Sequence, residues 1–285
     1  MASTDQQALQ TSVPVPGDGL DTARMPGHWL LARLGKRVLR PGGVELTRWM
    51  LDALGVDPED RVVELASGLG ATARLTLARR PAAYTAVDRD AAAVAALSAL
   101  AAPGPTKVRA IRSDAADTGL PDGDATIVYG EAMLTMQPYP AKRRVVREAR
   151  RLLDDSTGRY AIHELCLLPD DLDPALADRI TADLQDAIHV GARPLTPTGW
   201  TELLATEGFT VTARTTAPMA LLEPRRMIDD EGLIPALRIV GRALRNPAAL
   251  RRLLHMRRVF RRHSAHLVAI SLLAVPTPTE TPTEP

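Results

Sequence analysis

The chain has 285 residues, of which 45% are hydrophobic, and a formal net charge of +1. This length suffices for one large α/β domain or two small ones with a full core. The single cysteine, Cys166, excludes an intrachain disulfide framework and a cysteine-rich zinc site, and no metal is expected. No apolar run is long enough to span a membrane, and the first residues lack the pattern of a secretory signal. We therefore expect a cytoplasmic protein.

The chain divides into two tails, a helical segment and a main domain. Both ends are polar and carry several prolines, which is typical of disordered tails. After the first tail, two helices are predicted over 27–39 and 43–56, with "RPGG" between them. The predicted boundaries are disordered tails at 1–24 and 276–285, an N-terminal helical cap at 25–56, and a main domain at 57–275.

Strands and helices alternate through the main domain. Runs of β-branched and apolar residues predict strands, and residues with helical periodicity lie between them. Four strand-then-helix steps predict a parallel sheet that helices cover on both faces. The predicted strands are 61–66, 83–88, 107–114, 125–130, 158–165, 210–219 and 266–275.

Positive charge is concentrated near the end of the chain. No acidic residue lies between Gly232 and Thr279, a stretch that holds nine arginines, whereas residues 1–231 carry a net charge of −6. The segment 222–263 is helical in pattern and lies between the last two predicted strands. Long insertions of this kind more often carry function than sheet structure.

A turn rich in small residues follows the first predicted strand. In "VVELASGLGATA" the pattern reads Glu64-x-Ala66-x-Gly68-x-Gly70. Small residues there let backbone amides approach a ligand closely, and the next helix offers its positive N-terminus. A nicotinamide dinucleotide and S-adenosylmethionine (SAM) both bind at turns of this kind, so the turn alone leaves the ligand open.

Acidic residues end the second and third predicted strands as well. Asp88 stands 20 residues after Gly68, where a carboxylate can accept both hydroxyls of a ribose in either ligand. Two features favour SAM. Glu64 would repel a pyrophosphate but attract a sulfonium and an amino group, and Asp114 can accept the exocyclic amine of an adenine.

This ordered series resembles the class I SAM-dependent methyltransferases, and among them the methyltransferase type 11 and ubiquinone/menaquinone methyltransferase-like group. The resemblance covers about residues 58–165, where "LPDGDATIVYGEAM" and "KRRVVREARRLL" match the fourth strand and the following helix, and a strand pair near the C-terminus. It implies a doubly wound, Rossmann-like, seven-stranded sheet, mostly parallel with an antiparallel last strand. It also implies SAM as the cofactor and S-adenosylhomocysteine as the product.

The resemblance implies a role for each matching strand end. The first turn would face the methionine moiety, the second strand end the ribose and the adenine edge, and the third the adenine amine and ring nitrogen. The fourth would lie where cofactor and acceptor meet. Ala66 stands where the family usually has glycine, and we expect it to keep a negative φ. The implied cofactor-binding residues are Glu64, Ala66, Ser67, Gly68, Leu69 and Gly70; Asp88 and Arg89; Asp114 and Ala115; and Glu131.

Candidates for catalysis lie at the ends of the fourth and fifth strands. Glu131 and His163 are predicted to assist the reaction as base or orienting group, because open α/β sheets place ligands at the carboxyl ends of their strands. Met133, Met136 and Trp29 are predicted to contact the acceptor.

The predicted function is methyl transfer from SAM to a small organic acceptor at an O, C or S centre, by direct in-line displacement. Two alternatives stay open: an NAD(P)-dependent oxidoreductase on a Rossmann fold, and a catalytically silent SAM-binding scaffold. The oxidoreductase is disfavoured by Glu64 and Asp114 and by the absence of a Tyr-x-x-x-Lys pair.

The basic insertion has three interpretations, which the sequence leaves open. As a lid with the N-terminal helices, it would bring arginines to an anionic acceptor. As an amphipathic surface helix, residues 232–263 would make peripheral contact with an anionic membrane and admit a lipophilic acceptor. As a solvated face, it would pair with the acidic body or a partner chain. No nucleic-acid partner is expected, and a homodimer is a further expectation.

Overall fold

The computed structural model describes residues 21, 22, 24–100 and 104–278. Most of the two predicted tails lies outside these residues. The helices are α1 Gly27–Leu34, α2 Gly43–Leu54, α3 Ala71–Leu77, α4 Ala91–Ser98, α5 Tyr139–Leu152, α6 Pro174–Ile188, α7 Pro197–Thr206, α8 Pro224–Glu231, α9 Leu233–Leu244 and α10 Pro247–Arg262. The strands are β1 Arg61–Leu65, β2 Ala83–Asp88, β3 Lys107–Arg112, β4 Ile127–Glu131, β5 Arg159–Leu167, β6 Phe209–Pro218 and β7 Leu267–Pro276.

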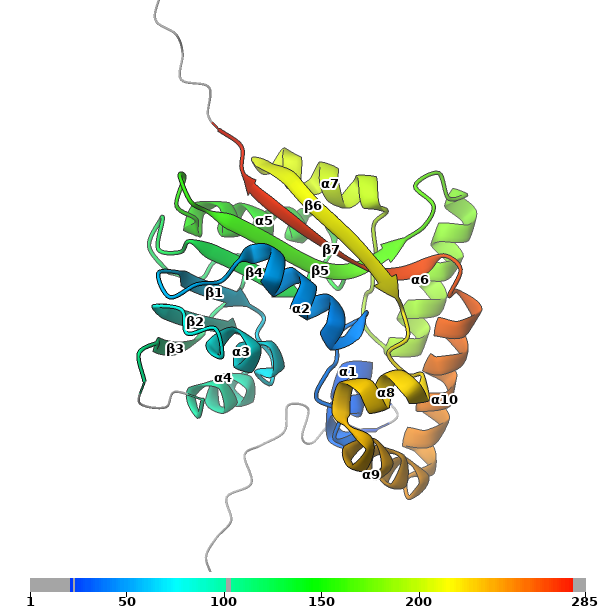
Figure 1. The fold of residues 1–285 in the computed structure, drawn as a ribbon. Helices are drawn as coiled ribbons and strands as arrows, with labels where there is room; N and C mark the ends of the chain where they lie inside the picture. The colour runs from blue at the N-terminus through cyan, green and yellow to red at the C-terminus, as the bar shows by residue number, and fades with distance from the viewer. Residues whose placement is uncertain (1–20, 23, 101–103, 279–285) are drawn as a thin grey trace, which may run out of the picture.

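The seven strands form one sheet in the order β3-β2-β1-β4-β5-β7-β6 (Figure 1). The first five strands pair in parallel, and β7 runs antiparallel to both β5 and β6. The predicted fold class is therefore confirmed, including the antiparallel last strand. The order reverses at β1, and the carboxyl ends of β1 and β4 lie beside each other at that point, where open α/β sheets bind ligands.

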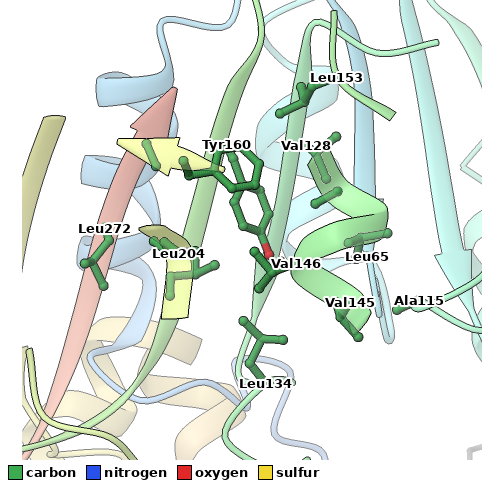
Figure 2. Close-up of a cluster of buried hydrophobic side chains, with 14 of the residues drawn as sticks. Leu65, Ala115, Val128, Leu134, Val145, Val146, Leu153, Tyr160, Leu204 and Leu272 are labelled. Carbon is green, nitrogen blue, oxygen red and sulfur yellow. The ribbon is translucent and has the colours of Figure 1, made fainter. Parts of the chain in front are cut away.

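Helices cover both faces of the sheet because alternate residues of each buried strand point to opposite sides. Val62 of β1 packs with α2, α3 and α4, whereas Val63 packs with α5 and α7. Figure 2 shows the second of these cores, in which Val146 of α5 lies beside Tyr160 of β5 and Val145 lies toward Ala115.

A third core holds together a group of helices at one end of the sheet. These helices are α1, α6, α8, α9 and α10, and we call them the cap. The segment 222–263, predicted as a helical insertion, forms α8, α9 and α10 between β6 and β7 (Figure 1). None of the described helices is long and apolar enough to cross a membrane.

The composition of the cap differs from the prediction in two ways. The helix expected over 27–39 ends at Leu34, because Gly35 adopts a left-handed conformation with a φ of 101°. Helix α2, expected in the cap, packs on the sheet against β5, β6 and β7 instead. Helix α6, which was not expected in the cap, packs against α1 and α10 and therefore belongs to it. Hydrophobic periodicity indicates which face of a helix is buried, but it does not indicate whether the sheet or other helices pack against that face.

Candidate functional site

A cavity of about 520 Å³ lies between the strand ends and the cap. Every predicted cofactor-binding residue except Gly70 lines it: Glu64, Ala66, Ser67, Gly68, Leu69, Asp88, Arg89, Asp114, Ala115 and Glu131. A Cβ atom at Gly70 would lie 2.9 Å from Leu100 and 3.1 Å from Leu97, next to α4. This glycine therefore serves the packing of α4 rather than the cavity wall.

The turn after β1 holds its shape through three left-handed residues. Ala66 has a φ of 56°, Gly68 a φ of 54° and Gly70 a φ of 74°, so the expectation of a negative φ at Ala66 was wrong. A Cβ atom is disfavoured in this region of backbone space but not forbidden. At Gly68 a Cβ atom would meet nothing within 4 Å, which leaves the backbone of this turn open to the cavity.

Asp88 ties the turn to the end of β2. One carboxylate oxygen accepts a hydrogen bond of 2.8 Å from the Gly68 amide, and the other accepts one of 2.9 Å from the Asp90 amide. At the end of β3, Asp114 accepts a bond of 2.8 Å from the Ala116 amide. Both carboxylates therefore have a fixed place in the cavity wall, where their remaining lone pairs can accept further hydrogen bonds.

Glu64 lies under the turn on the same face of the sheet as α2. It accepts hydrogen bonds from the hydroxyls of Tyr84 and Tyr129. Burial raises the pKa of Glu64 to about 8, because the charged form loses its hydration. The carboxyl group is thus mostly neutral at pH 7. The attraction between Glu64 and a cationic ligand, which the sequence predicts, would require this carboxyl group to release its proton.

Glu131 is the centre of a buried polar cluster at the end of β4. Its Oε1 atom accepts bonds of 2.5 Å from Thr47 of α2 and 2.7 Å from the His163 Nδ1 atom, and it lies 3.5 Å from Arg40 Nε. Thr72, in the first turn of α3, donates to Oε2. Although burial opposes ionisation, Arg40, His163 and Thr47 lower the pKa of Glu131 to about 2. Glu131 is therefore ionised at neutral pH and is a weak base.

His163 does not line the cavity, contrary to its prediction as a residue that could act as a base. The side chain is fully buried between β4 and the loop before α2. Its Nε2 atom lies 2.5 Å from the carbonyl oxygen of Pro41, and its Nδ1 atom contacts Glu131. Both neighbours are hydrogen-bond acceptors, so each ring nitrogen is engaged inside the protein and neither faces the cavity. The geometry favours an orienting role toward Glu131.

A different histidine faces the cavity. His28 of α1 lines it beside Trp29, with the two ring centroids 4.4 Å apart. Burial lowers the pKa of His28 to about 4, which keeps the imidazole neutral at pH 7. This residue was not among those predicted from the sequence. The sequence feature that could have identified His28 is its position next to a tryptophan in a predicted cap helix.

The loop after β4 is held in place by Glu164, which points to the opposite face of β5 from His163. Its carboxylate accepts bonds from the backbone amides of Met133, Leu134 and Thr135, and a bond of 2.6 Å from the Thr135 hydroxyl. This loop carries two predicted acceptor-contacting residues, Met133 and Met136, and both line the cavity. Glu164 thereby positions part of the wall without reaching the cavity itself.

The far wall of the cavity is apolar and comes mostly from the cap. Trp29, the third predicted acceptor-contacting residue, is part of it. The rest of this wall was not predicted, because its residues come from separate elements and share no motif. They are Leu31, Leu184, Ile188, Val190, Met219, Leu221, Met256 and Phe260.

Comparisons with known proteins agree with this geometry. Residues 62–156 match a family model described as a methyltransferase domain. An uncharacterized protein of Haemophilus influenzae is 35% identical over 222 residues, which span 77% of this chain and 86% of that protein.

Two solved structures share the fold at low identity. The [4+2]-cyclase SpnF has a TM-score of 0.67 at 17% identity, over 87% of this chain and 93% of its own. A Haemonchus contortus phosphoethanolamine N-methyltransferase, solved with S-adenosylhomocysteine, has a TM-score of 0.66 at 12% identity, over 88% of this chain and 57% of its own. With the matched domain and the sheet order, these findings lead to one conclusion: the chain contains a methyltransferase domain and has the fold of the class I SAM-dependent methyltransferases.

Proposed function

We propose that this protein binds SAM in the cavity at the strand ends and transfers its methyl group to a small, largely apolar organic acceptor at an O, C or S centre. The observation that carries the proposal is the two-sided cavity. Acidic strand ends and an open glycine turn form one side, and an apolar wall from the cap forms the other.

The residues present fit the cofactor. The open backbone at Gly68 leaves room for a ligand, and Asp88 and Asp114 supply acceptors suited to ribose hydroxyls and an adenine amine. Arg40 supports the fit independently. Its side chain lines the cavity at 6% exposure, its Nε atom lies 3.5 Å from Glu131, and its Nη2 atom has no hydrogen-bond partner among the described residues. A buried guanidinium with unused donors is suited to a carboxylate such as that of a methionine moiety.

Bound SAM would supply a methyl group on an electrophilic sulfonium. The chain's own contribution is to align the acceptor, exclude water and place negative charge nearby. Glu131 suits the last task because its neighbours keep it ionised and fixed. Direct displacement requires no covalent step by the protein, so the weak basicity of Glu131 and the burial of His163 are compatible with the proposal.

The apolar wall indicates the acceptor class. Apart from His28, the side chains that the cap helices themselves bring to the cavity are aliphatic, thioether or aromatic, so they favour an acceptor with a sizeable apolar part. A neutral His28 can accept a hydrogen bond from an acceptor hydroxyl, which none of its apolar neighbours can do.

Calorimetric titration with S-adenosylhomocysteine, with NAD and NADP as controls, tests the cofactor. We expect micromolar binding of S-adenosylhomocysteine alone, and binding of a nicotinamide nucleotide in its place would overturn the proposal. Tight binding without turnover on any panel of apolar acceptors would favour the silent scaffold. SpnF, a cyclase with this fold, shows why turnover has to be measured separately from the fold.

A pair of glycine variants tests the position of the cofactor. Gly68→Ala places a methyl group in the open space of the cavity, and we expect it to weaken S-adenosylhomocysteine binding at least about tenfold. Gly123→Ala is the matched control. Gly123 also has a positive φ and open space at its Cβ position, but it does not line the cavity. Equal loss of binding in both variants, or in neither, would contradict the proposed site.

A further inference from the structure

Helix α9 exposes an apolar face to solvent. Its buried side consists of small and aliphatic residues that join the core of the cap: Ala236, Ile239 and Ala243. On the outer side, Leu233, Ile234, Leu237 and Leu244 are each exposed by more than half, at 57%, 63%, 62% and 64%, and Val240 by 43%. Solvated helices of globular proteins usually place charged or polar residues in such positions.

These exposed residues form one continuous stripe. Leu233, Leu237, Val240 and Leu244 follow each other at spacings of four, three and four residues, which places them along one side of the helix. Ile234 and Leu237 also border a shallow groove that Arg238, Gly241, Arg242 and Arg245 complete. The apolar stripe therefore has arginines along one edge. In Figure 1, α9 lies at the outer end of the cap, away from the sheet.

The arginines of the basic segment differ in how they are paired. Arg257 and Arg261 pair with Glu223, and Arg262 pairs with Asp183. Among the residues that the structure describes, Arg238 and Arg245 have no ion-pair or hydrogen-bond partner, and both are exposed. Arg251 and Arg258 of α10 share this property, whereas Arg242 of α9 donates to the Leu34 carbonyl. Unpaired positive charge is therefore present along the edge of the apolar stripe and continues onto α10.

We infer that α9 docks on an anionic lipid bilayer, with its apolar stripe in the interface and Arg238 and Arg245 against acidic headgroups. An apolar face bordered by arginines is the pattern of helices that lie in a membrane surface. A second copy of the chain fits this face poorly, because a symmetric contact would place like charges together. The absence of acidic residues between Gly232 and Thr279 adds to the attraction, because nothing in that stretch opposes an anionic surface.

Docking would bring the bilayer close to the acceptor side of the cavity. The buried side of α9 shares a core with Leu31, Leu184 and Phe260, all of which line the cavity. A lipophilic acceptor could then pass from the bilayer to the apolar wall. This consequence rests on the proposed function, whereas the docking itself does not.

Flotation of the full chain with lipid vesicles tests the inference. The probes are vesicles of phosphatidylcholine alone and vesicles with about one third phosphatidylglycerol. One variant reverses the charge at the stripe, Arg238→Glu with Arg245→Glu, and a second removes its apolar part, Leu237→Ser with Leu244→Ser. The control makes the same change of charge at two exposed positions outside the cap, Arg48→Glu with Arg109→Glu.

We expect the wild type and the control to float with the anionic vesicles, and both α9 variants to bind at least about tenfold more weakly. High salt should weaken binding further. Failure of the wild type to bind anionic vesicles would overturn the inference and favour an acidic protein partner. Equal binding by all variants would also overturn it, because the contact with lipid would then lie outside α9. S-adenosylhomocysteine binding, measured without vesicles, separates this result from a failure of the proposed function.

Discussion

Two alanines at strand ends adopt a left-handed conformation that glycine would adopt at lower cost. Ala66 follows β1 with a φ of 56°, and Ala132 follows β4 with a φ of 54°. Both line the cavity. The sharp turns that these residues make lead the chain from a strand into a cavity-lining loop, so the site carries backbone strain that the rest of the fold must offset.

This strain predicts that Ala66→Gly stabilises the protein. Relief of the left-handed conformation is worth about 1–2 kcal/mol, and the greater freedom of glycine in the unfolded chain cancels about half of it. We expect the free energy of unfolding in urea to rise by up to about 1 kcal/mol. Ala161→Gly, at a buried position in β5 that has no positive φ, is the control and should be destabilising. A loss of stability in both variants would contradict the account of Ala66.

The buried cluster around Glu131 predicts a specific acid sensitivity. The pKa of Glu131 is about 2 in the folded chain, below its ordinary value of 4.5. Its contribution to stability is therefore present above pH 4.5 and is lost as the pH falls toward 2. Between pH 5 and pH 3, the wild type should lose about 2 kcal/mol more of its unfolding free energy than Glu131→Gln. The same pH dependence in both proteins would show that Glu131 is not held ionised.

At the scale of elements, a buried ion cluster attaches α8 to the segment between α1 and α2. Lys36 is 1% exposed and lies 3.4 Å from Glu231 and 3.7 Å from Asp230. Glu231 also accepts bonds of 2.9 and 2.8 Å from the amides of Arg37 and Val38. The insertion is thereby connected to a chain segment almost 200 positions earlier, which also carries Arg40 and Pro41.

This cluster predicts that Glu231→Ala is strongly destabilising. The substitution leaves a buried lysine and two amides without this partner, which should cost about 3 kcal/mol in unfolding free energy. Glu45→Ala, which breaks the exposed pair of Glu45 with Arg226 between α2 and α8, should cost less than about 1 kcal/mol. The urea midpoints of the two variants give the comparison. Similar losses would indicate that the Lys36 cluster contributes no more than a surface pair.

At the scale of the whole molecule, the cavity has two sides that belong to different layers. The strand ends of the sheet supply one, and the cap supplies the other. Helix α9 belongs to the cap but none of its residues lines the cavity. Cofactor binding and membrane docking would therefore use separate parts of the same molecule.

This separation predicts the pattern of amide hydrogen exchange. S-adenosylhomocysteine should slow exchange in the loops that follow β1, β2 and β3, because the ligand would order the backbone there. Exchange in α9 should stay the same with and without the ligand. Mass-spectrometric exchange on the full chain measures both. Protection confined to the cap would place the ligand in the wrong half of the cavity.

The sheet and the strand-end side of the cavity could be predicted from the sequence. Strand burial follows a local pattern, and parallel strands bring their carboxyl ends to one edge. For this reason the order of the strands was enough to place Asp88 and Asp114 together, although they are far apart in the chain. The conformation of Ala66 could not be predicted, because φ depends on how the turn fits between β1 and α3.

The sequence by itself determined the seven strands, the acidic strand ends and the basic segment between the last two strands, since these follow from periodicity, order and charge. Only the tertiary structure decided what Glu131 and His163 contact. Their partners Thr47 and Pro41 lie 84 and 122 positions away, and contacts at such separation leave no local pattern. The same reason explains why α6 rather than α2 joined the cap, and why α9 keeps an apolar face exposed. A buried and an exposed apolar stripe look alike in sequence until the packing of the whole chain assigns one of them to solvent.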